Sequence, residues 1–220
     1  AKVRPEVRQC LEVMKGWKVY HFHDTSATAK VRLTGDINDN EYFRPDASNL
    51  AAYLYWLKEK KATSYQNILN TVTQVAPFLE DFNLRPSPLN EEKILLEWRH
   101  THSDQYFNGH SLSDGTLRFI CLATLLLQPS PPATIIIDEP ELGLDGTALR
   151  RLVATLNDRK TAGTTLVLAT QDPRLLELCD GIVVMKAGTI QAAGPAAEVR
   201  SRIPLDRRPA AERSEQPAVH

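Results

Sequence analysis

The 220-residue sequence contains no Gly-Lys dipeptide. These residues therefore lack the loop GxxxxGKS/T, in which backbone amides surround the phosphates of a nucleotide and a lysine neutralises them. The longest apolar run is far too short to cross a bilayer, and the first residues, AKVRPEVRQC, do not have the pattern of a signal peptide.

Neither sign of charge predominates: 26 Lys and Arg side chains stand against 27 Asp and Glu side chains, with no long basic run. The composition therefore gives no support for avid, sequence-independent binding of nucleic acid. The only cysteines, Cys10, Cys121 and Cys179, show no CxxC spacing, and the last two lie in apolar segments where buried, reduced thiols are expected. We expect a soluble, cytoplasmic protein.

The first half of the chain predicts two strands with helices between them. The strand-like segments are WKVYHFHD (17–24) and KILLEWRH (93–100). Between them, NLAAYLYWLKEKK has an apolar helical face and starts at a candidate cap, Asn49, and SYQNILNTVTQVAPFLEDF repeats the pattern to about Pro77. We expect a partial lobe over 1–104 with a helical insertion at about 48–80.

After Gly109 strands and helices alternate, which is typical of a layered α/β fold. ATIIID and TTLVLATQD are continuous apolar strands, as expected when both faces of a parallel sheet are buried. A helix over 146–163 should end at Gly163, and two short strands should turn at Ala187-Gly188. We expect a core over 105–203 and, because 204–220 is nearly free of aliphatic residues, a disordered tail.

Two adjacent acids follow the first of these apolar strands. A carboxylate at the end of such a strand lies at the edge of the sheet where α/β folds bind ligands. Asp138 could bind Mg²⁺ while Glu139 orients and deprotonates an attacking water. The alternative is a strand that simply ends in two solvated acids.

A small polar turn, SLSDGT, comes one helix before these acids. Ser113 can cap the helix that follows, and Gly115 allows the backbone to approach a ligand closely. Together with the helix dipole, the free amides of the first turn form an anion site. Alone, the pattern indicates an ordinary capped helix, but its place before the Asp-Glu strand favours a contact with phosphate.

These segments resemble the motifs of ABC-type ATPases. LSDGT resembles the signature motif, TIIIDEP the Walker B strand, ELGLD the D-loop with its aspartate at Asp145, and LVLATQD the switch segment, with Gln171 in place of the usual histidine. The four motifs are in order and cover about half of the chain. The sequence of these motifs most resembles that of predicted AAA-type ATPases related to SMC and RecF heads. The sequence beyond Asp145 instead resembles the end of a transporter nucleotide-binding domain.

The resemblance implies a P-loop NTPase fold, with a mostly parallel sheet between helices, that hydrolyses ATP with Mg²⁺ as a dimer. Asp138 would hold the metal, and Glu139 and Gln171 would act in catalysis. Residues that would contact ATP are Leu112, Ser113, Asp114, Gly115, Thr116 and Asp145. Asp114 replaces a glycine of the motif and brings a negative charge close to the expected position of the γ-phosphate.

Two questions remain open: where the phosphate loop comes from, and which cellular process ATP hydrolysis would drive. We expect either a C-terminal piece of a longer protein or a half-head, with a second ATPase head supplying a phosphate loop across the interface. The SMC and RecF resemblance implies DNA repair or anti-phage defence, with DNA or a nuclease or effector protein as partner. An ABC transporter would instead need a membrane subunit, and a third possibility is an inactive remnant.

Other polar and aromatic groups have ordinary structural explanations. His21, His23 and Asp24 alternate as metal ligands could, but a polar strand face is the simpler interpretation. His100 and His102 suit a solvated connection. Helix packing explains Tyr53, Tyr55 and Trp56 better than stacking on bases, and Arg150 and Arg151 need no special role.

Overall fold

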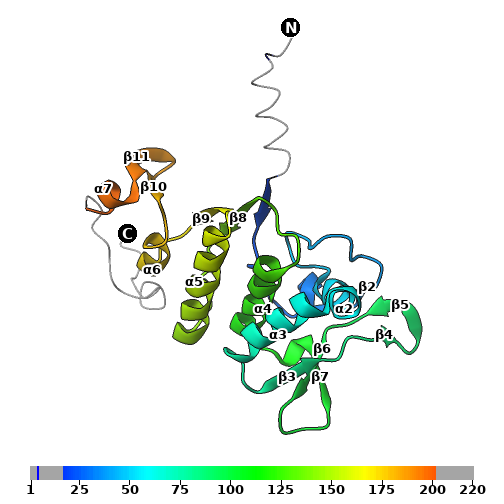
Figure 1. The fold of residues 1–220 in the computed structure, drawn as a ribbon. Helices are drawn as coiled ribbons and strands as arrows, with labels where there is room; N and C mark the ends of the chain where they lie inside the picture. Colours follow the sequence, from blue (N-terminus) through cyan, green and yellow to red (C-terminus); the bar gives the residue numbers. More distant parts are fainter. Residues whose placement is uncertain (1–3, 5–16, 202–220) are drawn as a thin grey trace, which may run out of the picture. The chain divides into compact units, whose positions relative to one another are not determined.

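A computed structural model describes Arg4 and residues 17–201 (Figure 1). Cys10 and the tail expected at 204–220 lie outside the described residues. The chain divides into two compact units, Ala1–Leu168 and Ala169–His220. Each unit is described by itself.

The first unit contains a three-stranded sheet in the order β1-β8-β9 (Figure 1). Its strands are β1 (Lys18–Tyr20), β8 (Thr134–Asp138) and β9 (Thr165–Ala169). β1 and β8 are parallel, with Lys18 opposite Ile135 and Tyr20 opposite Ile137. The predicted parallel pairing is confirmed, and the carboxyl ends of β1 and β8 lie at the same edge.

Only one face of this sheet is covered by described residues. Tyr20, Ile135 and Ile137 are buried, whereas Val19 is 50% exposed and its partner Ile136 is half-buried. On β9, Val167 is 46% exposed. The prediction that these strands are buried on both faces was therefore wrong. A continuous run of apolar residues shows that both faces of a strand can be buried, but not that the described residues bury both faces.

Two long helices accompany the sheet, α4 (Asp114–Leu127) and α5 (Gly146–Thr161). α4 contacts both α3 and α5, and every residue from 117 to 126 is buried, which suits a helix that is apolar on all sides (Figure 1). Cys121 is a free, buried thiol, as predicted, and burial raises its pKa to about 12, whereas Cys179, also free, is only half-buried. α5 stops just before Gly163, whose φ is 90°, as predicted.

The expected helical pair is α2 (Leu50–Lys60) and α3 (Ala62–Thr73). α2 starts after Asn49, as predicted, but the Asn49 side chain does not cap the helix: it accepts a hydrogen bond from the Arg44 amide and donates to the carbonyls of Asp39 and Tyr42. Asn49 thus ties down the preceding loop and not the helix. Tyr53 is buried and donates to Gln128, so its packing role is confirmed.

Three boundaries differ from the predicted ones. β1 ends at Tyr20, so the second half of the strand predicted over 17–24 is not in the sheet. α3 ends at Thr73, before Pro77, because a residue that precedes proline is disfavoured in helical conformation. The segment 93–100 is two strands, β5 (Asn90–Ile94) and β6 (Glu97–His100), in different sheets. Burial alternates without a break through Ile94, Leu96 and Trp98, so periodicity alone could not reveal the change of hydrogen-bonding partners.

Two small antiparallel sheets complete the first unit, in the orders β2-β5-β4 and β3-β6-β7. Their remaining strands are β2 (Gly35–Asp36), β3 (Leu79–Phe82), β4 (Pro86–Ser87) and β7 (Tyr106–Asn108). Two short 3₁₀ helices, η1 (Lys30–Arg32) and η2 (Gly109–Ser111), lie on the connections that lead to the site described below.

The second unit is a hairpin with two short helices. Its elements are α6 (Pro173–Leu176), β10 (Gly181–Lys186), β11 (Thr189–Pro195) and α7 (Ala196–Arg200). The hairpin turns at Ala187-Gly188, with φ values of 48° and 76°, which confirms the predicted position. Ile182, Ala196 and Val199 form its small core. Within the described part of the chain, no helix combines the length and apolarity needed to cross a bilayer.

Candidate functional site

The two predicted carboxylates lie where β8 leaves the sheet. Asp138 is the last residue of the strand, Glu139 follows it, and both are half-buried. Glu139 has a φ of 42°, a left-handed conformation that is uncommon for any residue other than glycine. Backbone strain of this kind often occurs at functional sites, because the surrounding structure must hold it in place.

A histidine from the segment that follows the neighbouring strand β1 lies beside them. Nε2 of His23 is 3.9 Å from the carboxylate of Glu139 and 3.2 Å from the carbonyl oxygen of Asp138. The sequence pattern predicted a polar strand face for His23 and did not indicate its place beside the carboxylates. A usable signal existed, since the ends of two adjacent parallel strands meet at one edge of the sheet.

The predicted signature turn is a capped helix start. The Ser113 hydroxyl accepts a hydrogen bond from the Thr116 amide and lies 2.8 Å from the Thr116 hydroxyl. Leu112 is buried beneath the turn, whereas Ser113 and Asp114 are exposed. The predicted cap is confirmed, and the polar side of the turn faces outward.

Gly115 brings this turn against the loop that follows the carboxylates. A Cβ atom at Gly115 would collide with the carbonyl oxygen of Gly143. Only glycine allows so close an approach of the two backbones. The signature turn and the predicted D-loop of one chain are therefore in direct contact.

Arg118 of α4 links the same loop to the end of β1. Its guanidinium donates to the carbonyls of Phe22 and His23, at 2.8 and 3.0 Å, and to the carbonyl of Leu142. Burial lowers the pKa of Arg118, while the negative charge of Asp114 acts in the opposite direction. One side chain thus fixes three segments around the carboxylates.

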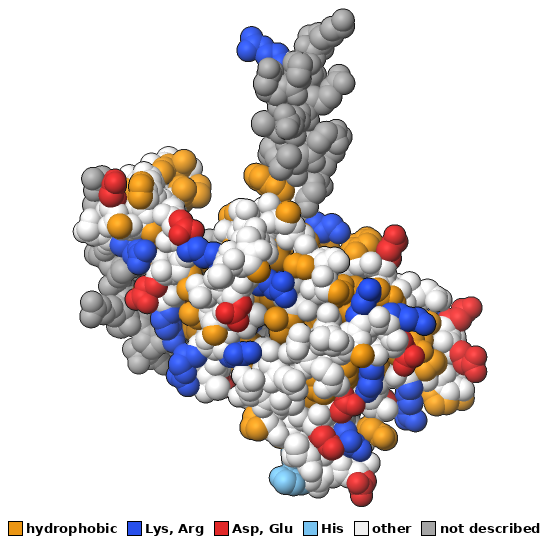
Figure 2. Space-filling model, viewed as in Figure 1, with side chains coloured by type: hydrophobic (Ala, Val, Ile, Leu, Met, Phe, Trp, Pro, Cys, Tyr) orange, Lys and Arg blue, Asp and Glu red, His pale blue; other side chains and the backbone are white. Residues whose placement is uncertain are grey.

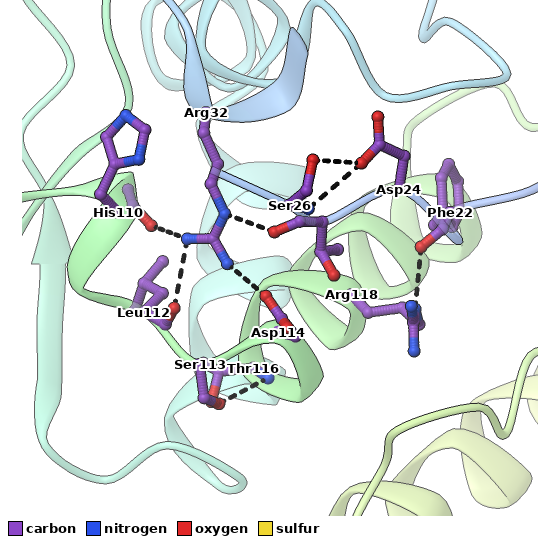
Figure 3. A network of polar contacts seen from close by, with 12 residues as sticks. Phe22, Asp24, Ser26, Arg32, His110, Leu112, Ser113, Asp114, Thr116 and Arg118 are labelled. Carbon is purple, nitrogen blue, oxygen red and sulfur yellow. Dashed lines mark hydrogen bonds and ion pairs between the residues drawn. The ribbon is translucent and has the colours of Figure 1, made fainter. Parts of the chain in front are cut away.

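A second buried arginine, Arg32, reaches the signature turn from η1 (Figure 3). It donates to the carbonyls of Thr25, Gly109 and Leu112, and its Nη2 lies 2.7 Å from the carboxylate of Asp114. An open pocket of about 550 Å³ adjoins this contact. Its lining consists of Thr25, Ser26, Ala27, Arg32, His110, Leu112, Ser113 and Asp114.

The two remaining predicted residues are placed differently. The Asp145 carboxylate accepts hydrogen bonds from the amides of Thr147 and Ala148, both at 2.8 Å, and so caps α5. Gln171 is exposed, follows β9 and belongs to the second unit. The structure thus brings Asp138, Glu139 and the D-loop close together in the first unit.

Mg²⁺ prefers oxygen ligands, and Asp138 offers a carboxylate at this edge of the sheet. No cluster of three or more His, Cys, Asp and Glu side chains suited to a metal ion occurs among the described residues. Mg²⁺ commonly takes only one or two carboxylates from a protein and fills its other positions with water and substrate phosphate. Half-buried Asp138 at the edge of the sheet fits that pattern.

Comparisons with known proteins identify the family of the chain. The family described as "AAA domain, putative AbiEii toxin, Type IV TA system" matches residues 13–177. The nickel import ATP-binding protein NikO of Rhodobacter capsulatus is 37% identical over 103 residues, which cover 45% of this chain and 40% of NikO. The ABC-type transporter ATP-binding protein EcsA of Bacillus subtilis is 30% identical over 110 residues, covering 50% of this chain and 43% of EcsA.

Solved structures show the same fold. An ATP-binding subunit of an ABC transporter superposes with a TM-score of 0.51 and 18% identity, covering 94% of this chain and 70% of that one. An Smc head bound to the C-winged helix domain of ScpA gives 0.52 and 13%, covering 86% and 55%. The chain spans less than half the length of the two curated relatives. The fold is that of these transporter and Smc ATP-binding heads. Because the family match extends over well over half of the chain, the protein belongs to this AAA-domain family.

Proposed function

We propose that the chain binds and hydrolyses ATP with Mg²⁺ as one head of a head-to-head dimer. The observation that carries the proposal is the pair Asp138–Glu139 at the end of β8, held beside His23 and the D-loop. Family membership supports nucleotide binding. The roles of individual residues are inferred from their positions.

In this proposal Glu139 is the general base. Its half-exposed carboxylate accepts a proton from the water that attacks the γ-phosphate. Asp138 holds Mg²⁺, which supplies positive charge to the phosphate oxygens when it is bound. Gln171 hydrogen-bonds the γ-phosphate or the attacking water, because its amide both donates and accepts.

The signature turn acts on the nucleotide of the second head. The amides at the start of α4 face a phosphate there, with Ser113, Gly115 and Thr116 around it and Leu112 anchoring the turn from below. Asp145 orders the D-loop at the same interface. The phosphate loop comes from outside these 220 residues, and the open face of the β1-β8-β9 sheet leaves room for further structure.

Replacing the proposed base tests this function. Glu139→Gln keeps the size and backbone demands of the side chain but cannot accept the proton, so kcat for ATP should fall by about 10² to 10⁴-fold. The protein is produced as its gene encodes it, and phosphate release is measured at saturating ATP and Mg²⁺. The matched control is Glu91→Gln, an exposed change on β5. An unchanged kcat for Glu139→Gln would remove Glu139 as the base.

We further propose that hydrolysis serves DNA repair or anti-phage defence in the cytoplasm, with a nuclease or another effector protein as partner. The family description, which names a toxin of a Type IV TA system, supports this choice. On the face shown in Figure 2, acidic and basic side chains are interspersed, so this face offers DNA no continuous basic path. We therefore propose a protein, in preference to DNA, as the partner that binds this chain.

The transporter alternative is supported by the names of NikO and EcsA. Affinity purification from the native host distinguishes the two roles. Recovery of a nuclease, effector or DNA would support defence or repair. Recovery of a transmembrane subunit would support transport, and a protein that neither binds nor hydrolyses ATP would be an inactive remnant.

A further inference from the structure

Arg32 is buried although it has no place in the motifs of the site. Its side chain is 4% exposed, and each of its nitrogens donates a hydrogen bond (Figure 3). Three of its four acceptors are backbone carbonyls, which cannot move without distorting the loops that carry them. The fourth is the carboxylate of Asp114. The guanidinium is thus fixed in space before any ligand arrives.

Asp114 poses an electrostatic problem for the turn. It is the first residue of α4, and its side chain is 67% exposed. A carboxylate here stabilises the helix, because the N-terminal amides carry partial positive charge. For the same reason it repels a phosphate that would use those amides. An uncompensated Asp114 would therefore weaken an anion site at this turn.

The position of Arg32 addresses this problem. Its Nη2 lies 2.7 Å from the Asp114 carboxylate, a charge-assisted contact, while Nη1 holds the carbonyls of Gly109 and Leu112 just before the turn. The neighbouring carboxylate of Asp24 is engaged by the amide and hydroxyl of Ser26, so it does not take the place of Asp114 (Figure 3).

We propose that Arg32 is a positioning residue for the signature turn: it neutralises Asp114 and holds that carboxylate aside, so that the amides of residues 113–115 remain available to a nucleotide phosphate. The inference rests on the proposed function, in which this turn contacts ATP. It also explains how an aspartate can replace a glycine of the motif. The replacement works because a cation from another segment accompanies it.

A cycle of variants separates neutralisation from mere support of the fold. Arg32→Met leaves Asp114 uncompensated, and the KM for ATP should rise about tenfold while kcat changes less, because Glu139 is intact. Adding Asp114→Asn removes the repelling charge, and KM should return to within about twofold of the wild-type value, because the double variant, like the wild-type pair, has no net charge at these two positions. A purely structural role predicts no such rescue, since the bonds to the three carbonyls remain lost.

Two further variants keep the test usable if Arg32→Met folds poorly. Asp114→Asn with Arg32 intact should lower KM, because the guanidinium then adds uncompensated positive charge to the site. Arg32→Lys should stay closer to the wild type than Arg32→Met. The matched control is Arg99→Met, which removes a more exposed arginine from its 2.8 Å contact with Glu80 and should leave KM unchanged.

The outcomes identify which idea fails. If Glu139→Gln abolishes turnover but Arg32→Met leaves KM unchanged, the role of Arg32 is refuted and the proposed function stands. A double variant as impaired as Arg32→Met, or an Asp114→Asn protein with a raised KM, also refutes it. If Glu139→Gln hydrolyses ATP normally, the proposed function fails whatever the arginine variants do.

Discussion

At the scale of single residues, the positions of the two carboxylates could be predicted, whereas the arginines that hold the surrounding loops could not. Asp138 and Glu139 follow an apolar strand, and that local signal places them at the edge of a sheet. Arg32 and Arg118 bond to carbonyls 77 and 96 residues away, which no local pattern encodes. Arg118 at least stands as a single charge in the apolar run LRFICL, and an unusual charge of this kind indicates a buried polar role.

The close contact at Gly115 gives a prediction at this scale. Gly115→Ala would place a methyl group against the carbonyl of Gly143, so the turn and the D-loop must separate. The free energy of unfolding should fall by about 1–3 kcal/mol, as for other overpacked sites. Chemical denaturation followed by circular dichroism measures the change.

Gly146→Ala is the matched control for that substitution. There the nearest atom to a new Cβ is Nη1 of Arg150, at 3.5 Å, and a long exposed side chain can move. The control should change the unfolding free energy by less than about 0.5 kcal/mol. Equal stabilities of the two variants would contradict the close packing of turn and loop.

At the scale of elements, long segments with strong signals were predicted well and junctions were not. α4 and α5 are preceded by the caps Ser113 and Asp145, whose side chains accept hydrogen bonds from amides of the first turn, so the starts of both helices are encoded locally. Asn49 has the same sequence signal but its side chain bonds the loop before α2. Cap residues bind whichever partner the tertiary structure offers, and the sequence does not show which.

Asp145 allows the structural and the proposed catalytic roles to be separated. Asp145→Ala loses two hydrogen bonds to the start of α5 and should cost about 1 kcal/mol of stability. Asp145→Asn retains an acceptor oxygen and should unfold like the wild type. If Asp145 also acts at the nucleotide, the asparagine variant should hydrolyse ATP more slowly at unchanged stability. Normal turnover by this variant would reduce Asp145 to a helix cap.

At the scale of the whole molecule, the proposed active site is divided between polypeptide segments. The sheet has one open face among the described residues, with Val19 and Val167 exposed on its strands, and the 220 residues contain no phosphate loop. The absence of a phosphate loop can be read directly from the sequence. The open face of the sheet could not be predicted, because apolar strands have the same sequence pattern whether one or both faces are covered.

Complementation between two inactive variants tests the divided site most directly. Ser113→Glu places a negative charge on the signature turn, and Glu139→Gln removes the base. A mixed dimer then contains one site with an intact base from one head and an intact turn from the other. As a control, Asp138→Asn paired with Glu139→Gln should restore nothing, because each site then lacks one carboxylate.

The decisive measurement is ATP turnover by co-expressed Ser113→Glu and Glu139→Gln heads. The account predicts about a quarter of wild-type activity, since half of the dimers are mixed and each mixed dimer has one working site. A mixture as inactive as either variant alone would contradict it.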